Sequence, residues 1–235
     1  MMFEATVIQA SVRGNKEEGI PNQDFIDVFE NDYLMIATVS DGLGSSKKSL
    51  EGAKIACTTV IDEIQNFPIL SDVQLLDGFI KTRWEQEINH LSDSYIDYRT
   101  TISFVAVFKK DKKIIVGQLG DVLVSLRIDG LYRYLQSTIK DFSNETDCLG
   151  SGRNELFNIA IYEFGHSFDF IIATDGIADE LQTEKIEPFH DYLKSKFQKI
   201  DLELRNQVLK DEIEEFINEK NNDDKSLVFI WSNKI

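Results

Sequence analysis

The chain has few cysteines, few prolines and no long apolar run. Only two cysteines occur among 235 residues, Cys57 and Cys148, and neither lies in a metal-binding or redox spacing such as C-x-x-C. We therefore expect both to be reduced, small apolar side chains. No apolar run approaches the length that spans a bilayer, and the N-terminus lacks a basic start followed by an apolar core. These absences predict a cytoplasmic protein.

Basic residues are scarce relative to acidic ones. The chain has 25 Lys and Arg against 41 Asp and Glu, which gives a net charge of −16. Nucleic acids and anionic membranes are bound through clustered Lys and Arg, so we expect no nucleic-acid partner and no membrane partner. The excess of carboxylates is compatible with a protein that gathers acids around cations. We also expect a monomer.

Neither repeats nor linker-like segments interrupt the chain. It contains three prolines, and its 42% hydrophobic content with 16 Phe is enough for a substantial core. We therefore predict one domain that spans residues 1–235.

Short segments rich in β-branched and aromatic residues predict strands, and turns with Asn, Asp or Gly between several of them imply antiparallel hairpins. Apolar residues at three- to four-residue spacing predict helices that each bury one face. The helices are grouped between runs of strands, which is typical of an α+β sandwich. The predicted strands are 5–12, 25–29, 33–39, 101–108, 113–119, 122–128, 131–135, 156–162, 168–173 and 227–231, and the predicted helices are 49–66, 72–92 and 201–218.

The segment SDGLGSSKKS, residues 40–49, follows an apolar run and allows two interpretations. As a nucleotide-binding P-loop it fits poorly, because Lys47 stands where the second glycine belongs and Asp41 would face the phosphates. As a metal-binding turn it fits better, because Asp41 ends a buried strand and Gly42 lets its carbonyl approach the same divalent cation. We favour the metal-binding turn, and a nucleotide-binding enzyme is the weaker alternative.

Other aspartates also stand at the ends of predicted strands. They are Asp24, Asp121, Asp175 and Asp223. A single aspartate at such a position is usually a turn former or a helix cap. Several of them at converging strand ends would repel one another strongly, so they must either lie far apart or have cations between them.

Six segments, in order, resemble the signature segments of the metal-dependent protein phosphatases of type 2C, and most of all the compact bacterial subgroup. The resemblance covers about residues 10–231 and implies a four-layer α-β-β-α sandwich with a central antiparallel β-sandwich. This fold agrees with the periodicity. The segments are NQDF, VSDGLGSSKKSLEGAKIA, RTTISFVAVF, GQLGDVLVSL, FIIATDGIADEL and DDKSLVFIW.

The resemblance implies a catalytic centre with two Mn²⁺ or Mg²⁺ ions. Asp41 resembles the bridging ligand, Asp24 and the Gly42 carbonyl resemble ligands of one ion, and Asp175 and Asp223 resemble ligands of the other. Two such ions lower the pKa of a bridging water, which generates a hydroxide for in-line attack on a phosphoryl group. The implied reaction is hydrolysis of phosphoserine and phosphothreonine monoesters.

Further positions follow the family with some departures. Asp121 and Asp179 resemble the acids that hold a weaker third metal in bacterial members. Arg13 is a candidate for binding the substrate phosphate, although a long loop separates it from Asp24, and Asp224 replaces the asparagine of a common D-N pair. The polar segment 140–154 corresponds to a flap beside the active site.

These implications predict a serine/threonine protein phosphatase whose partner is a phosphorylated protein, either a serine/threonine kinase or the targets of one. The alternative is a catalytically silent phosphatase-like domain that binds phosphoproteins or acts as a regulatory scaffold. A silent relative would be expected to lose metal-binding acids, whereas this chain has an aspartate at each of the implied positions.

Overall fold

The computed structural model describes residues 4–67, 72–91, 94–135, 146–152, 157–215 and 222–232. One sheet contains β1 (Ala5–Val12), β6 (Leu123–Ile128), β7 (Leu131–Leu135), β9 (Phe168–Ala173) and β10 (Lys225–Ser232), in the order β1-β10-β9-β6-β7. The other contains β2 (Asp24–Glu30), β3 (Leu34–Asp41), β4 (Ile102–Phe108), β5 (Lys113–Leu119) and β8 (Asn158–Glu163), in the order β2-β3-β4-β5-β8. All the paired strands are antiparallel.

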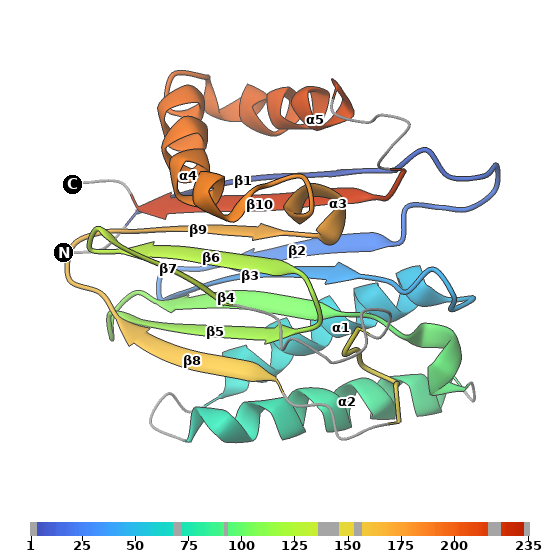
Figure 1. Ribbon diagram of the computed structural model, residues 1–235. Coiled ribbons are helices and arrows are strands. Elements are labelled where there is room, and N and C mark those ends of the chain that lie inside the picture. The colour runs from blue at the N-terminus through green and yellow to red at the C-terminus, as the bar shows by residue number, and fades with distance from the viewer. Residues whose placement is uncertain are drawn as a thin grey trace.

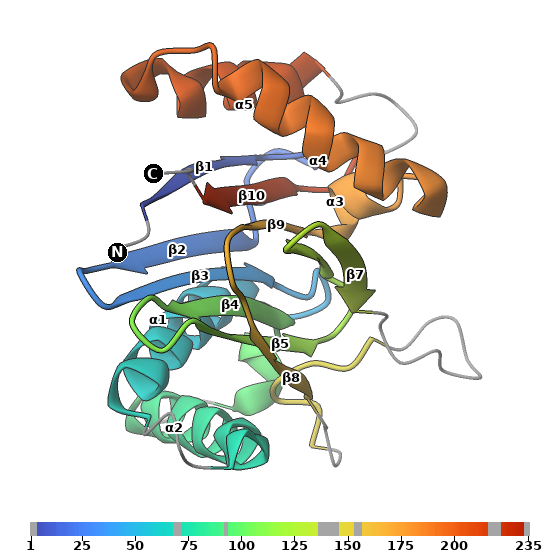
Figure 2. The same cartoon turned by 90° about the vertical axis from the view of Figure 1, so that its left-hand side faces the viewer.

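Helices cover the outer face of each sheet, so the molecule has four layers (Figure 1 and Figure 2). The helices α4 (Thr183–Phe197) and α5 (Arg205–Glu215) cover the β1-β10-β9-β6-β7 sheet, and α1 (Ser49–Asn66) and α2 (Leu76–His90) cover the other. A short helix, α3 (Asp175–Ala178), follows β9, and 3₁₀ turns occupy Val73–Leu75, Tyr95–Tyr98 and Leu202–Leu204. The predicted α+β fold with a central antiparallel sandwich is thereby confirmed.

Three apolar cores hold the layers together, and strand β3 contributes side chains to two of them. Its side chains alternate in direction, so Ile36 packs toward the α1 and α2 helices while Met35 and Val39 pack between the two sheets. Because both faces of the strand are buried, its sequence is almost continuously apolar rather than alternating. The third core, which contains Phe197 and Phe229, lies between the other sheet and helices α4 and α5.

The observed elements follow the predicted ones closely, but helices α3 and α4 and the 3₁₀ turn Tyr95–Tyr98 were not predicted. Strands 5–12, 113–119, 131–135 and 168–173 and helix 49–66 have the predicted bounds, and the other predicted elements differ by a few residues at their ends. The predicted ends at residues 92 and 218 and the predicted start at 156 lie outside the described residues. Of the segment 140–154, only 146–152 is described.

Helix α4 was not predicted from the sequence. Pro188 lies inside it, and a fully buried histidine, His190, takes a place in its apolar stripe. The ring of His190 is hydrogen-bonded to Ser125 Oγ at 2.7 Å and to Asp169 Oδ1 at 2.6 Å, so its polar atoms are satisfied inside the core. The sequence therefore lacks a clear helical pattern here, because Pro188 usually interrupts a helix and His190 is a polar residue on the buried face.

No helix among the described residues is long and apolar enough to cross a membrane.

Two helical glycines provide a test of the packing around α1. A Cβ at Gly52 would lie 1.9 Å from the Tyr98 carbonyl oxygen, whereas a Cβ at Gly78 in α2 would meet no atom within 4 Å. We expect Gly52→Ala to destabilise the protein by about 1–3 kcal/mol through overpacking. We expect Gly78→Ala to stabilise it by up to about 1 kcal/mol, because alanine favours helix over glycine. Urea unfolding of both variants measures the difference, and a stabilised Gly52→Ala variant would contradict the close approach.

Candidate metal centre

Asp24 and Asp41 form a cross-strand pair at one end of the sandwich. Asp24 is the first residue of β2, Asp41 is the last of β3, and the antiparallel register places them directly opposite each other. Asp24 is only 4% exposed. Like charges opposite each other in a ladder are destabilising, and burial adds a desolvation cost. The fold therefore holds two carboxylates where a positive charge would stabilise them.

Threonines of neighbouring segments hold this pair in place. Thr101 N–H donates to the Asp41 carbonyl at 2.8 Å, Thr100 Oγ1 donates to the same oxygen at 2.8 Å, and Asp41 N–H donates to Thr101 Oγ1 at 3.0 Å. From the other sheet, Thr174 Oγ1 donates to Asp24 Oδ2 at 2.9 Å. The site is thus fixed by contacts from both sheets.

Gly42 follows Asp41 and is in close contact with two segments of backbone. Its N–H donates to the Gln23 carbonyl at 3.2 Å, and a Cβ at this position would lie 2.8 Å from both the Gln23 oxygen and the Ser49 carbonyl carbon. Because no other residue would fit without moving the backbone, glycine is required here.

The remaining predicted acids stand at the same end of the sandwich. Asp121 lies between β5 and β6 and accepts a hydrogen bond from Thr146 Oγ1 at 2.8 Å. Asp175 begins α3 directly after β9, Asp179 follows α3, and Asp223 directly precedes β10. Burial and the charges of Asp121 and Asp223 raise the pKa of Asp179. The structure therefore brings together acids that are far apart in the sequence.

Burial and mutual repulsion raise the pKa values of the central carboxyl groups. Burial raises the pKa of Asp24 to about 7, and the charges of Asp224 and Asp175 add to the shift. Burial, with repulsion from Asp223, raises the pKa of Asp175 to about 6. Burial and the charge of Asp24 hold the pKa of Asp41 well above its usual 3.8. Protons or metal ions are needed to relieve this repulsion.

A divalent cation fits the chemistry of these groups. Among the described residues, Asp175 Oδ1 is a buried oxygen without a hydrogen-bond partner, as expected for an atom that binds an ion. The surrounding donors are carboxylates, which Mg²⁺ and Mn²⁺ prefer. Within the described part of the chain, no three His, Cys, Asp or Glu side chains are already arranged to hold one ion, so metal binding would require side-chain movement.

Arg13, the predicted phosphate-binding residue, contacts the loop that follows it. Its Nε donates to the Ile20 carbonyl at 2.6 Å, and its guanidinium nitrogens donate to the carbonyls of Gly14, Lys16 and Glu17. In this arrangement the guanidinium connects several backbone carbonyls of the loop 14–20 to one another. Arg13 would have to give up some of these bonds to bind a phosphate, and its role in substrate binding stays a prediction.

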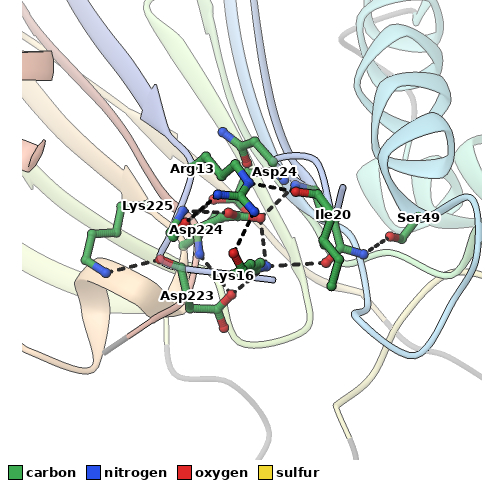
Figure 3. A network of polar contacts seen from close by, with 12 residues as sticks. Arg13, Lys16, Ile20, Asp24, Ser49, Asp223, Asp224 and Lys225 are labelled. Atoms are coloured by element: carbon green, nitrogen blue, oxygen red, sulfur yellow. Dashed lines mark hydrogen bonds and ion pairs between the residues drawn. The ribbon is translucent and has the colours of Figure 1, made fainter. Parts of the chain in front are cut away.

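Lys16 is a part of the site that the sequence did not reveal, and its partner Asp224 was noted there only as a departure from the D-N pair. Figure 3 shows the Lys16 ammonium between two carboxylates, 2.9 Å from Asp223 Oδ1 and 2.8 Å from Asp224 Oδ2. The buried Asp224 also accepts the N–H groups of Gly14 at 2.8 Å and Gln23 at 2.7 Å. No local pattern marks Lys16, because it lies in an irregular loop and meets its partners only in the folded chain.

A cavity of about 700 Å³ opens beside the acids. Asp175, Asp179 and Asp223 line one part of it, and Lys16 and Ile20 of the loop after β1 line another. A group bound in this cavity would therefore contact both the acids and the loop.

Comparison with known proteins agrees with this architecture. The family model described as protein phosphatase 2C matches residues 13–217, and the chain therefore belongs to the protein phosphatase 2C family. The match ends before Asp223. A search of curated proteins found no match.

Several solved structures have a similar fold. RsbX in complex with magnesium has a TM-score of 0.64 and 17% sequence identity, with coverage of 99% of this chain and 100% of that one. The catalytic domain of the serine/threonine protein phosphatase PstP, in complex with two manganese ions, has a TM-score of 0.62 at 14% identity and 99% coverage of each chain. The S. agalactiae serine/threonine phosphatase has a TM-score of 0.64 at 19% identity, with coverage of 97% and 99%.

The raised pKa values predict how stability depends on pH when no metal is present. In EDTA, folded Asp24 and Asp175 keep their protons up to about pH 7 and about pH 6, whereas the unfolded chain loses them near 3.8. The folded state binds more protons in this window, so these two groups make stability fall as pH rises through it. We expect the thermal midpoint of wild type to fall more steeply between pH 4.5 and 7.5 than that of Asp24→Asn, measured by differential scanning fluorimetry. Parallel curves would contradict the raised pKa of Asp24.

Proposed function

We propose that this chain is a Mn²⁺- or Mg²⁺-dependent protein serine/threonine phosphatase. The observation that carries the proposal is the convergence of acids from the strand ends of both sheets at one place, where burial and repulsion raise their pKa values. A protein gains nothing in stability from such an arrangement without a cation. Membership in the protein phosphatase 2C family supports the reaction class.

The proposed ligand roles are those that the family resemblance implies for these residues. Asp41 would bridge two ions, with Asp24 and the Gly42 carbonyl on one ion and Asp175 and Asp223 on the other. The metals of the magnesium-bound and manganese-bound similar structures support this choice of ion. When bound, two such ions would stabilise charge on the phosphoryl oxygens and lower the pKa of a water between them.

Asp121 and Asp179 are the proposed ligands of a third, weaker ion. The charges of both groups raise the pKa of Asp175, which places them within electrostatic range of the main centre. Asp121 is half-buried and Asp179 is exposed, whereas Asp24 is buried. Weaker desolvation would make this the weaker metal position.

The cavity beside the acids supports a protein substrate. It has room for a phosphorylated side chain, and its rim includes the partly exposed Ile20 and the loop residues Asn15 and Glu17. If a phosphoserine or phosphothreonine enters here, its phosphoryl group would meet the metal ions held by the acids. Its peptide backbone would then contact the loop. The proposed partner is accordingly a phosphorylated protein, a serine/threonine kinase or its targets.

Replacement of Asp41 tests the reaction. We expect Asp41→Asn to lower Mn²⁺-dependent hydrolysis of p-nitrophenyl phosphate and of a phosphothreonine peptide by at least about a hundredfold, because loss of the bridging carboxylate removes ion-based charge stabilisation. EDTA should abolish wild-type turnover, and added Mn²⁺ should restore it. Asp62→Asn, an exposed aspartate of α1, is the matched control and should keep full activity.

The same experiment separates the enzyme from the silent alternative. A wild-type protein that binds Mn²⁺ in calorimetry but hydrolyses neither substrate would be a phosphatase-like binding or regulatory domain. Near-normal rates in Asp41→Asn would reject the proposed centre itself. Circular dichroism of both variants ensures that any loss of activity is not a loss of fold.

A further inference from the structure

Lys16 lies inside the acid-rich end of the sandwich without belonging to any helix or strand. Its ammonium contacts Asp223 Oδ1 at 2.9 Å, Asp224 Oδ2 at 2.8 Å and Gln23 Oε1 at 3.3 Å. Its side chain is 18% exposed, whereas the two carboxylates differ: Asp223 is 48% exposed and Asp224 only 1%. One cation thus joins a buried anion to an accessible one (Figure 3).

The two halves of this contact have different strengths. Asp224 is buried and also accepts the backbone N–H groups of Gly14 and Gln23, so its bond to Lys16 compensates a charge that has no access to water. The bond to Asp223 is more exposed and more easily exchanged for water. A lysine has a flexible stem and three donors, so it can release one partner and keep the other.

We propose that Lys16 is an internal counter-cation that competes with the metal for Asp223. This inference rests on the proposed function, which makes Asp223 a ligand. A divalent ion at Asp223 and the ammonium 2.9 Å from the same carboxylate would repel each other strongly. Metal binding therefore displaces Lys16 from Asp223, while Asp224 keeps the lysine and its loop attached. Lys16 thereby partly neutralises the empty site and weakens the affinity for the ion.

Two other cations lie near this contact and are held differently. Arg13, on the same loop, directs its donors to backbone carbonyls, and Lys225, which follows the two acids, donates to the Asp223 carbonyl oxygen at 3.1 Å. Lys16, by contrast, contacts the Asp223 carboxylate itself, at Oδ1. Its removal should therefore alter metal affinity more than the loss of an equal charge elsewhere.

The test is calorimetric titration of metal-free protein with Mn²⁺ alone. We expect Lys16→Gln to bind Mn²⁺ about tenfold more tightly than wild type, because a positive charge beside the ion is removed. Lys16→Arg keeps the charge and should stay near wild type. Lys109→Gln is the matched control, because Lys109 pairs with Glu30 at the opposite end of β2 and changes the net charge equally.

Amine labelling of the wild-type protein tests the same displacement without a variant. Acylation of Lys16, followed by mass spectrometry, should be faster with saturating Mn²⁺ than in EDTA, while Lys109 should react equally in both. Unchanged affinity in Lys16→Gln together with unchanged labelling would overturn the inference and leave the proposed function standing. Wild-type protein that binds no Mn²⁺ would overturn the metal centre itself, and the inference with it.

Discussion

The repulsion between buried and half-buried carboxylates is the constraint on which the rest of this structure depends. Asp24 and Asp41 are placed opposite each other by strand register, and Asp175 is added from the other sheet. Such a group is costly to bury, so the surrounding layers must be stable enough to hold it. The three apolar cores provide that stability, and the acids stand at the strand ends, where backbone position is fixed by the ladders.

The aspartates at this end of the molecule differ in how far their negative charge is compensated by hydrogen bonds and ion pairs. Asp224 is satisfied by fixed contacts, namely two backbone N–H groups and the Lys16 ammonium, and it ties the loop after β1 to the start of β10. The central acids have fewer such contacts, and the buried Asp175 Oδ1 has no hydrogen-bond partner in the described part of the chain. A permanently compensated aspartate thus lies beside carboxylates that have fewer compensating contacts.

Much of the fold was predictable because periodicity reports local burial. Strand β3 and helix α1 bury apolar faces that can be seen in the residue order alone. Helix α4 was not predicted because the polar His190 is buried through hydrogen bonds to residues on two strands, β6 and β9, which a local sequence pattern does not show. The acids were found because aspartates recur at strand ends, but that pattern could not tell whether Asp223 is balanced by a cation, as the Lys16 contact shows it to be.

The sequence by itself determined the class of architecture, the family resemblance and the identity of the acids, because each of these is written in residue types at fixed local spacings. Only the tertiary structure decided which charges meet. It directed Arg13 to backbone carbonyls and Lys16 to two carboxylates, although both belong to the same loop. The physical reason is that electrostatic energy depends on distance and burial in space, and segments about two hundred residues apart in the chain come into contact only when both sheets have formed.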